Sequence, residues 1–339
     1  MRVVLDAMGG DHAPSVNVEG AVETVNGCDD VDVILVGEES LIQKELRNKR
    51  YRASRISVVH ASQVVEMHES PMVAIRKKKD SSIRVGIGLV KAGKADAFVS
   101  AGHSGVVMAT SLLILGTAKV VDRPAIATLM PTLKDTFVML DVGATVDCNA
   151  ENLLQFALMG STYCRLVLER PDPKVALLSI GEEDIKGNEV TKEAFKLIKK
   201  SKLNFIGNIE GKDIFSGMAD VVVCDGFIGN IALKISEGLA ETILKMLKRE
   251  ISSVTTGRIG YLMMKPAIRN FKKRTDYDEY GGAPLLGING TSIISHGRSS
   301  SKAIKNALRV AADYAAKRVY EAISIDIEKD LHDRQESLA

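Results

Sequence analysis

The sequence has no tryptophan, and its aromatic residues together make up only 4% of 339 residues. A platform of aromatic side chains for stacking nucleic-acid bases is therefore not expected. A strong excess of one charge is also missing, because 45 lysines and arginines nearly balance 43 acidic residues. The resulting formal charge of +2 gives no electrostatic reason to expect a nucleic-acid partner.

Long apolar runs and paired cysteines are lacking as well. No stretch approaches the roughly 20 apolar residues that span a bilayer, and the N-terminus reaches an acid at Asp6, unlike a signal peptide. None of the four cysteines (Cys28, Cys148, Cys164 and Cys224) belongs to a C-x-x-C pair. These features predict a cytoplasmic protein with reduced, buried thiols.

Several motifs of enzyme chemistry are absent too. There is no GxxxxGK[ST] loop, no GxSxG and no HExxH, and the six histidines lack paired metal spacing. The stretch Gly86-Ile87-Gly88 lacks the third glycine of a dinucleotide fingerprint. The sequence therefore disfavours a covalent nucleophile on the chain, and we expect neither a metal nor another cofactor.

The residues that are present indicate an α/β fold. Short apolar, β-branched runs alternate with segments of helical period, which is typical of a doubly wound, mostly parallel sheet covered on both faces. Strands are expected at 3–5, 31–36, 56–59, 97–99, 126–129, 137–140, 175–178, 204–206 and 221–224. Helices are expected near 15–25, 39–48, 82–93, 104–117, 149–167, 188–200, 229–253 and 302–323.

Five of these strands run into polar loops that contain glycine. Ligands of such sheets bind beyond the carboxyl ends of the strands, so the five loops are expected to meet at one rim. The loops are 6–12, 100–105, 141–145, 179–188 and 225–230.

The loop before residues 104–117 is the best candidate for a phosphate cradle. A helix N-terminus offers free N–H groups and a positive dipole end, and glycine lets the backbone approach a ligand closely. The predicted phosphate-binding residues are Gly102, His103, Ser104, Gly105 and Asn230. For Gly102–Gly105 taken alone, an ordinary serine cap with a glycine turn is an equally good interpretation.

Taken together, these loops resemble those of the PlsX phosphate acyltransferase family over nearly the whole chain. Each motif is weak alone, but the order of all of them is specific. The resemblance rests on Asp6-Ala7-Met8-Gly9-Gly10-Asp11-His12-Ala13-Pro14, Ser100-Ala101-Gly102, Asp141-Val142-Gly143-Ala144, Glu183-Asp184 with Lys186-Gly187-Asn188, Asp225-Gly226-Phe227 with Gly229-Asn230, Tyr280-Gly281-Gly282-Ala283 with Leu285-Leu286-Gly287, and His296-Gly297. Two loops depart from the pattern: His103 and Ser104 replace an asparagine and a threonine of the family's Ser-Ala-Gly-Asn-Thr-Gly, and Thr145 replaces the asparagine that follows its Asp-Val-Gly-Ala.

The resemblance implies a fold like that of isocitrate and isopropylmalate dehydrogenases and of phosphotransacetylases, usually in a homodimer. It also implies transfer of a fatty acyl group from acyl carrier protein to inorganic phosphate. The acyl phosphate then supplies a glycerol-3-phosphate acyltransferase at the membrane.

We hypothesise that phosphate itself is the nucleophile, so that the enzyme mainly orients it and stabilises an oxyanion. Lys186 is the candidate for that charge, and Asn188 is a candidate hydrogen-bond donor. Asp225 either orients Lys186 or accepts a proton, and His12 is a further candidate for proton transfer. Surface lysine, turn and cap roles are the competing interpretations. The predicted substrate-binding residues are Asp6, Gly9, Gly10, Asp11, Asp141 and Gly143.

A basic, amphipathic segment is expected within a helical hairpin at 236–276. Apolar and basic side chains there form adjacent stripes suited to an anionic bilayer, although a core or dimer helix and a dock for the acidic carrier protein fit the pattern too. The predicted membrane contacts are Tyr261, Met264, Lys265, Ile268, Arg269 and Phe271.

The remainder of 1–339 is expected to form one large α/β unit, with two interleaved lobes as the alternative. Three other functions stay open at this point: an acyl-CoA:phosphate transferase of the phosphotransacetylase type, a dehydrogenase of related fold, and a non-catalytic scaffold for lipid-synthesis enzymes at the membrane edge.

Overall fold

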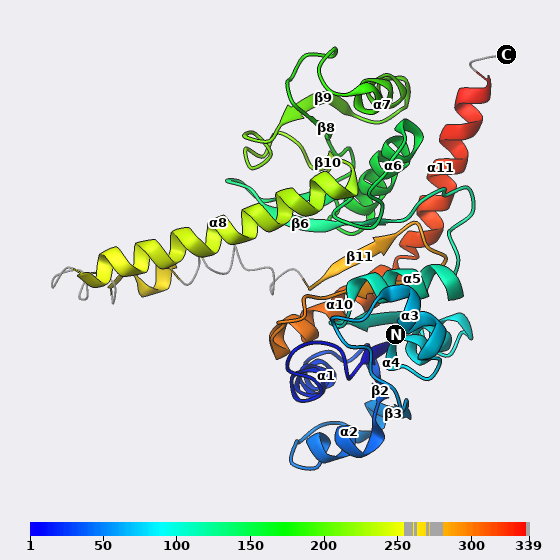
Figure 1. Cartoon of the computed structure of the whole chain (residues 1–339), viewed down its shortest axis with the longest axis vertical. Helices are drawn as coiled ribbons and strands as arrows, with labels where there is room; N and C mark the ends of the chain where they lie inside the picture. Colours follow the sequence, from blue (N-terminus) through cyan, green and yellow to red (C-terminus); the bar gives the residue numbers. More distant parts are fainter. Residues whose placement is uncertain (254–259, 261–262, 269–270, 272–280, 337–339) are drawn as a thin grey trace.

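The computed structural model describes residues 1–253, 260, 263–268, 271 and 281–336. Two sheets, each with its own helices, make up the body of the molecule, and one long helix extends away from it (Figure 1). Both sheets are mostly parallel, with antiparallel strands at their edges.

Seven of the described strands form the first sheet. The order across it is β3 (Ile56–His60), β2 (Asp32–Gly37), β1 (Arg2–Asp6), β4 (Ala97–Ser100), β12 (Ser292–Ile294), β11 (Ala283–Leu286) and β5 (Ala125–Ile126). One face packs on α1 (Ser15–Gly27), α2 (Glu39–Leu46) and α10 (Ser301–Ala316). The other face packs on α3 (Pro71–Lys77), α4 (Ser82–Lys91) and α5 (Ser104–Ile114). Central strands such as β4 are buried along their whole length because helices cover both faces.

Five of the described strands form the second sheet. Their order is β6 (Thr128–Pro131), β7 (Thr136–Leu140), β10 (Val221–Val223), β8 (Val175–Ser179) and β9 (Phe205–Glu210). The helices α6 (Ala150–Leu166), α7 (Glu189–Lys200) and α11 (Val319–Glu336) cover one face. A short 3₁₀ helix, η1 (Ala53–Arg55), precedes β3 in the first sheet.

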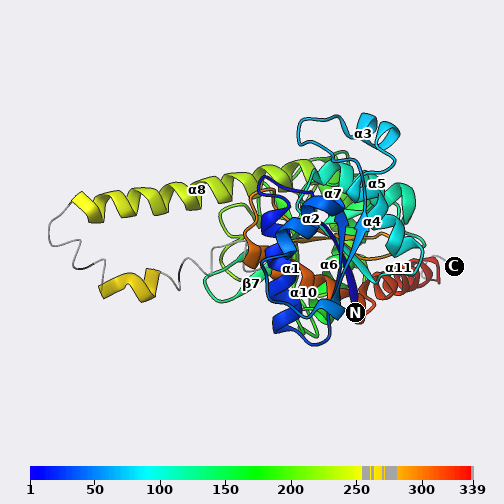
Figure 2. The ribbon, with the colours of Figure 1, turned by 90° about the horizontal axis from the view of Figure 1, so that it is seen from below.

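The two sheets are joined at β5. Strand β5 pairs with β11, while the backbone N–H of Ile126 donates to the carboxylate of Asp141, which follows β7 of the second sheet. Helix α8 (Gly226–Ser253) starts beside Asp141, and its far end projects beyond the body (Figures 1 and 2). Residues 263–268 are also helical.

The predicted α/β class with mostly parallel pairing is confirmed, but the prediction of one doubly wound sheet is wrong, since the strands divide between two sheets. The run 126–129 is two strands, one in each sheet, because the chain crosses between them there. The helix expected over 302–323 is interrupted at Lys317–Arg318, where Arg318 has a positive φ of 49°. The extent of the hairpin at 236–276 and the division into domains stay predictions.

Candidate active site

A cleft of about 660 Å³ lies where the two sheets meet. Its walls come from loops of the first sheet on one side and from β6, the loop after β7 and α8 on the other. The lining residues are Asp11, Met67, Gly102, Ser104, Ile126, Thr128, Leu129, Val142, Gly143, Asn230, Leu233, Lys234, Glu237, Gly282, Ala283, Ile294, Ser295, His296, Gly297, Arg298, Ser299 and Ala303. Several loops predicted to share a rim therefore do meet.

The loops after β1 and β4 are locked together beneath the cleft surface. The Ser100 hydroxyl donates to Oδ2 of the buried Asp6 over 2.7 Å, and the Met8 N–H donates to Oδ1. Burial raises the pKa of Asp6, while these hydrogen bonds oppose the rise. A Cβ on Gly9 would lie 2.6 Å from the Gly102 nitrogen, so only glycine lets the two loops touch. Asp6 thus holds the loops and does not line the cleft.

The N-terminus of α5 opens into this cleft. His103 occupies the N-cap position but makes no side-chain hydrogen bond to the helix, and Gly102 and Ser104 line the cleft. The first N–H groups of a helix carry partial positive charge and suit an anion. The buried Nδ1 atom of His103 has no hydrogen-bond partner, so its side chain adds an unused polar group beside the loop.

The segment after β12 supplies a second polar wall. Ser295 is only 6% exposed and lines the cleft, and its hydroxyl has no hydrogen-bond partner among the residues that the structure describes. A buried hydroxyl without a partner is costly, which suggests that a ligand completes it. Further along, Arg298 lies 3.9 Å from the carboxylate of Asp11, and the Asp11 N–H donates to the Gly297 carbonyl over 2.8 Å.

The opposite wall is built around Asp141. Its fully buried carboxylate accepts backbone N–H bonds from Ile126, Gly143, Ala144 and Thr145 at 2.6–3.1 Å. Burial raises the pKa of Asp141, and these N–H groups oppose the rise. Like Asp6, Asp141 therefore shapes a loop and leaves Gly143 to line the cleft.

Helix α8 packs closely against the Asp141 loop. A Cβ on Gly229 would lie 1.9 Å from the Asp141 carbonyl oxygen, so α8 approaches within backbone contact. Asn230 and Lys234 follow on the next turn and both line the cleft. Among the described lining residues, Lys234 is the one lysine. The wall of the cleft that the first sheet supplies carries the N-terminus of α5 and Ser295.

Asp225 caps the start of α8 and also holds the loop that precedes α6. Its Oδ1 accepts the Phe227 N–H over 2.8 Å, and its Oδ2 accepts the Cys148 N–H over 3.2 Å. Burial, reinforced by the Asp225 carboxylate, raises the pKa of the Cys148 thiol to about 12. All four cysteines are free thiols, as predicted, but only Cys164 and Cys224 are buried, whereas Cys28 and Cys148 are half-buried.

The structure thus gathers only part of the predicted site. Asp11, Gly102, Ser104, Gly143 and Asn230 line one cleft. Gly9, Gly10 and His103 lie in the adjoining loops and Gly105 in the first turn of α5; a Cβ on Gly10 would come within 3.0 Å of the Gly297 carbonyl oxygen.

The predicted catalytic residues lie outside that lining. Lys186 is exposed on the loop after β8, and Asn188 caps α7 by accepting the Thr191 N–H over 2.9 Å. His12 is exposed at the start of α1, where its carbonyl accepts the Val16 N–H. The catalytic roles of Lys186, Asn188, Asp225 and His12 stay predictions.

Sequence reasoning missed several polar residues of the cleft, among them Lys234, Glu237, Ser295 and Arg298. A signal existed for Lys234, because it stands four residues after Asn230 on a predicted helix and so shares its face. Ser295 and Arg298 flank the motif His296-Gly297, but the short strand before them was not predicted.

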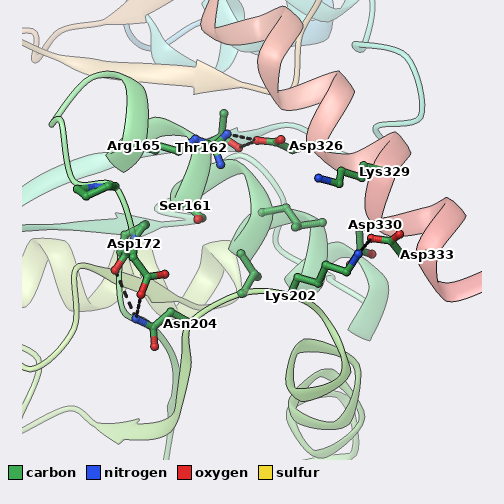
Figure 3. Close-up of a pocket in the computed structure, with 14 residues that line it drawn as sticks. Ser161, Thr162, Arg165, Asp172, Lys202, Asn204, Asp326, Lys329, Asp330 and Asp333 are labelled. Atoms are coloured by element: carbon green, nitrogen blue, oxygen red, sulfur yellow. Dashed lines mark hydrogen bonds and ion pairs between the residues drawn. The ribbon is translucent and has the colours of Figure 1, made fainter. Parts of the chain in front are cut away.

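A second, smaller hollow of about 180 Å³ lies between α6 and α11 (Figure 3). Four of its charged side chains pair with one another: Arg165 with Asp326 and Lys202 with Asp333. It contains none of the predicted site residues. Among the described residues, no group of three or more histidine, cysteine or acidic side chains is arranged to hold a metal ion.

Two of the predicted membrane contacts, Tyr261 and Arg269, fall outside the described residues. Met264, Lys265 and Phe271 are exposed, and Ile268 is half-buried. Within the described helices, none is both long and apolar enough to cross a bilayer.

The architecture is that of phosphotransacetylases. The chain is similar to a phosphotransacetylase from Streptococcus pyogenes, with a TM-score of 0.64 and 19% identity over 93% of this chain and 94% of the other. A weaker likeness, with a TM-score of 0.52 and 13% identity over 93% of this chain and 97% of the other, links it to a 4-hydroxythreonine-4-phosphate dehydrogenase from Klebsiella pneumoniae. The predicted likeness to phosphotransacetylases is confirmed, whereas the likeness to isocitrate and isopropylmalate dehydrogenases stays a prediction.

Sequence comparison is more specific. A family model described as "Fatty acid synthesis protein" matches residues 1–322. A phosphate acyltransferase from Thermodesulfovibrio yellowstonii is 59% identical over 324 residues, which cover 96% of this chain and 93% of that protein. The chain therefore belongs to the PlsX phosphate acyltransferase family of fatty acid and phospholipid synthesis.

Proposed function

We propose that the cleft binds orthophosphate and directs one of its oxygens at the thioester of an acyl group carried by acyl carrier protein. The new bond joins this oxygen to the acyl carbon, and the carbon–sulfur bond breaks. The sulfur takes up a proton and leaves as the free carrier thiol, and the acyl group leaves as acyl phosphate. Phosphate is itself the nucleophile, so the protein needs no covalent intermediate.

One observation carries the phosphate site: the unpartnered, buried Ser295 hydroxyl lines the same cleft as the N-terminus of α5 and Lys234. A hydroxyl, helix N–H groups and an ammonium are three kinds of donor that suit a multiply charged oxyanion. Asn230 adds an amide from the opposite wall. Orientation by these groups and stabilisation of the developing oxyanion provide the catalysis.

For the positive charge we favour Lys234 over Lys186. Both lysines are exposed, but Lys234 lines the cleft, whereas Lys186 lies on a loop of the second sheet outside that lining. The earlier assignment of Lys186, with Asn188, Asp225 and His12 as its helpers, remains the competing proposal. Substitution of the two lysines in parallel distinguishes the assignments.

A homodimer is proposed because α8 carries a continuous apolar stripe on its exposed side. Ile231, Ile235, Leu239 and Ile243 recur every four residues and are exposed in the single chain. A stripe of this length on a monomer is unusual and marks an interaction surface. Light scattering compares the mass of the wild type with that of an Ile235→Asp, Leu239→Asp variant, which should be monomeric. A variant with the same mass as the wild type would reject the stripe as the interface.

Peripheral contact with an anionic membrane is proposed for the far end of α8 and the helical residues after it. Met263, Met264 and Phe271 are exposed there, next to Lys265. Apolar side chains beside a basic one suit the boundary of an anionic bilayer. Such contact would keep a cytoplasmic enzyme close to the glycerol-3-phosphate acyltransferase that consumes its product.

The reaction is tested by incubating the purified chain with acyl carrier protein and varying orthophosphate. We expect thiol release and acyl phosphate formation in equal amounts, both dependent on phosphate. We also expect Ser295→Ala to raise the KM for phosphate at least tenfold. Thiol release without phosphate would indicate a thioesterase, and efficient use of acyl-CoA would favour the phosphotransacetylase alternative.

A further inference from the structure

The connection between β3 and α4 of the first sheet contains a short helix that lies beside the cleft. Residues 61–81 leave β3 and return to α4, with a bridge between Gln63 and Ser81 closing the loop and α3 at its centre. Figure 2 shows α3 at the upper right edge of the body, near α5, whereas α8 extends away to the left. We call its outward-facing residues the α3 surface: Met67, Met72, Val73, Arg76, Lys77 and Lys79.

The α3 surface combines exposed apolar and basic side chains. Met72 is 58% exposed and Val73 is 45% exposed. Arg76, Lys77 and Lys79 are exposed and make no ion pair with any part of the chain that the structure describes. This mixture favours a protein partner with an apolar contact and an acidic rim.

Residues 61–81 carry a small excess of positive charge, with four basic residues (Arg76, Lys77, Lys78 and Lys79) against three acids (Glu66, Glu69 and Asp80). Glu69 pairs with Lys78 and also accepts the Glu66 N–H. Asp80 accepts from the N–H and the hydroxyl of Ser62. The hydrogen bonds from Ser62 lower the pKa of Asp80 and keep it ionised, so Glu66 and Asp80 offset part of the charge of Arg76, Lys77 and Lys79.

The α3 surface is continuous with the cleft. Met67 belongs to both, and its terminal carbon would lie 3.8 Å from a Cβ on Gly297 in the wall that carries Ser295. Pro71, the first residue of α3, would lie 3.3 Å from a Cβ on Gly105 in the first turn of α5. A partner seated on α3 would thus deliver an extended arm directly to the proposed phosphate site.

We propose that the α3 surface docks the acidic acyl carrier protein, with Arg76, Lys77 and Lys79 facing its acidic side and Met72 and Val73 at the centre. This inference rests on the proposed function, because it assumes that the acyl donor is a protein. The basic segment near Lys265 is the rival dock. Its described residues, 263–268, follow the far end of α8 and are not among the described residues of the cleft lining, whereas α3 adjoins the cleft.

The test is steady-state kinetics with two donors, acyl carrier protein and the small donor acyl-CoA. The variant Arg76→Glu, Lys77→Glu is compared with a control, Lys91→Glu, Lys94→Glu. Both pairs are exposed and lie at or just beyond the last turn of a short helix, so both variants change the charge by the same amount at similar positions. Thermal melting checks that both remain folded.

We expect the α3 variant to raise the KM for acyl carrier protein about tenfold, equivalent to about 1.4 kcal/mol, with kcat and the reaction of acyl-CoA unchanged. Its KM should also lose much of the salt dependence of the wild type, since the lost interaction is electrostatic. Met72→Ser should raise the same KM but keep the salt dependence. The control variant should behave like the wild type.

Three results would overturn the inference while leaving the proposed reaction intact: an unchanged KM for the carrier, an equal loss with acyl-CoA, or a loss confined to liposome binding. A larger effect from Lys265→Glu would assign the dock to the rival segment. If the wild type makes no acyl phosphate at all, the proposed function fails first.

Discussion

The substitution Gly229→Ala, at the start of α8, tests whether the close packing of this helix positions the residues of the cleft. The new Cβ would lie 1.9 Å from the Asp141 carbonyl oxygen and 2.9 Å from the Cys224 sulfur. The first of these is a backbone atom, held by neighbours on both sides, and cannot swing away. Relief of the overlap to an ordinary contact of 3.4 Å requires α8 to shift by about 1.5 Å.

Two opposing effects decide the magnitude. Replacement of glycine by alanine inside a helix gains about 1 kcal/mol, while overpacking costs about 1–3 kcal/mol, so the fold should survive with a modest loss. Activity should suffer far more, because the shift carries Asn230 and Lys234 with it. A displacement of about 1 Å at reacting groups lowers turnover by about a hundredfold.

The matched control is Gly238→Ala on the same helix, where nothing lies within 4 Å of the added Cβ. That variant should melt higher, by the equivalent of about 1 kcal/mol, and keep its activity. The assay follows acyl phosphate formation at saturating phosphate and acyl donor. If Gly229→Ala retains wild-type kcat with an intact fold, the close approach of α8 does not position the site.

Three further predictions concern single side chains. Lys234→Ala should lower kcat/KM for phosphate by about 10²–10³-fold while Lys186→Ala changes it less than tenfold, and the reverse order would restore the assignment to Lys186. Asp141→Asn should lower the free energy of unfolding by about 3 kcal/mol, seen as a lower melting temperature, because its amide nitrogen would face backbone N–H donors; an unchanged melting temperature would contradict the hydrogen-bond geometry. At pH 8 only about one Cys148 thiol in 10⁴ should be ionised, so its alkylation, followed by mass spectrometry, should be very slow and should accelerate as pH rises towards 12. Asp225→Asn removes a charge that raises this pKa and should speed the alkylation.

Much of the fold could be predicted from local pattern. Strands β1, β2, β4, β7, β8 and β10 are apolar runs buried on both faces, and the helices between them have clear periods and polar starts. Asn149, for example, forms a capping box with Asn152 at the start of α6. Such elements are specified by neighbouring residues alone.

Other elements could not be predicted because long-range contacts define them. Strands β11 and β12 have only four and three residues and owe their place to pairing with β4 and β5. Helix α3 lies in a segment with no clear apolar period. The division into two sheets depends on strand order, which the sequence does not state.

The site, like the fold, could be predicted from the sequence only in part. Glycines and acids after strands mark the loops, but the pattern cannot say which side chains face a ligand. Asp6 and Asp141 look like ligand-binding acids in sequence, whereas their carboxylates are used up by backbone and hydroxyl donors. Ser295 looks ordinary in sequence, and only its burial without a partner in the folded chain marks it.

The central claim is that phosphate binds where α5, the segment after β12 and α8 converge. The most direct measurement is a crystal structure of the enzyme soaked with orthophosphate. We predict one phosphate within hydrogen-bond distance of the Ser104 backbone, the Ser295 hydroxyl and the Lys234 ammonium. A phosphate bound instead at Lys186 and Asn188, with the cleft empty, would contradict the account.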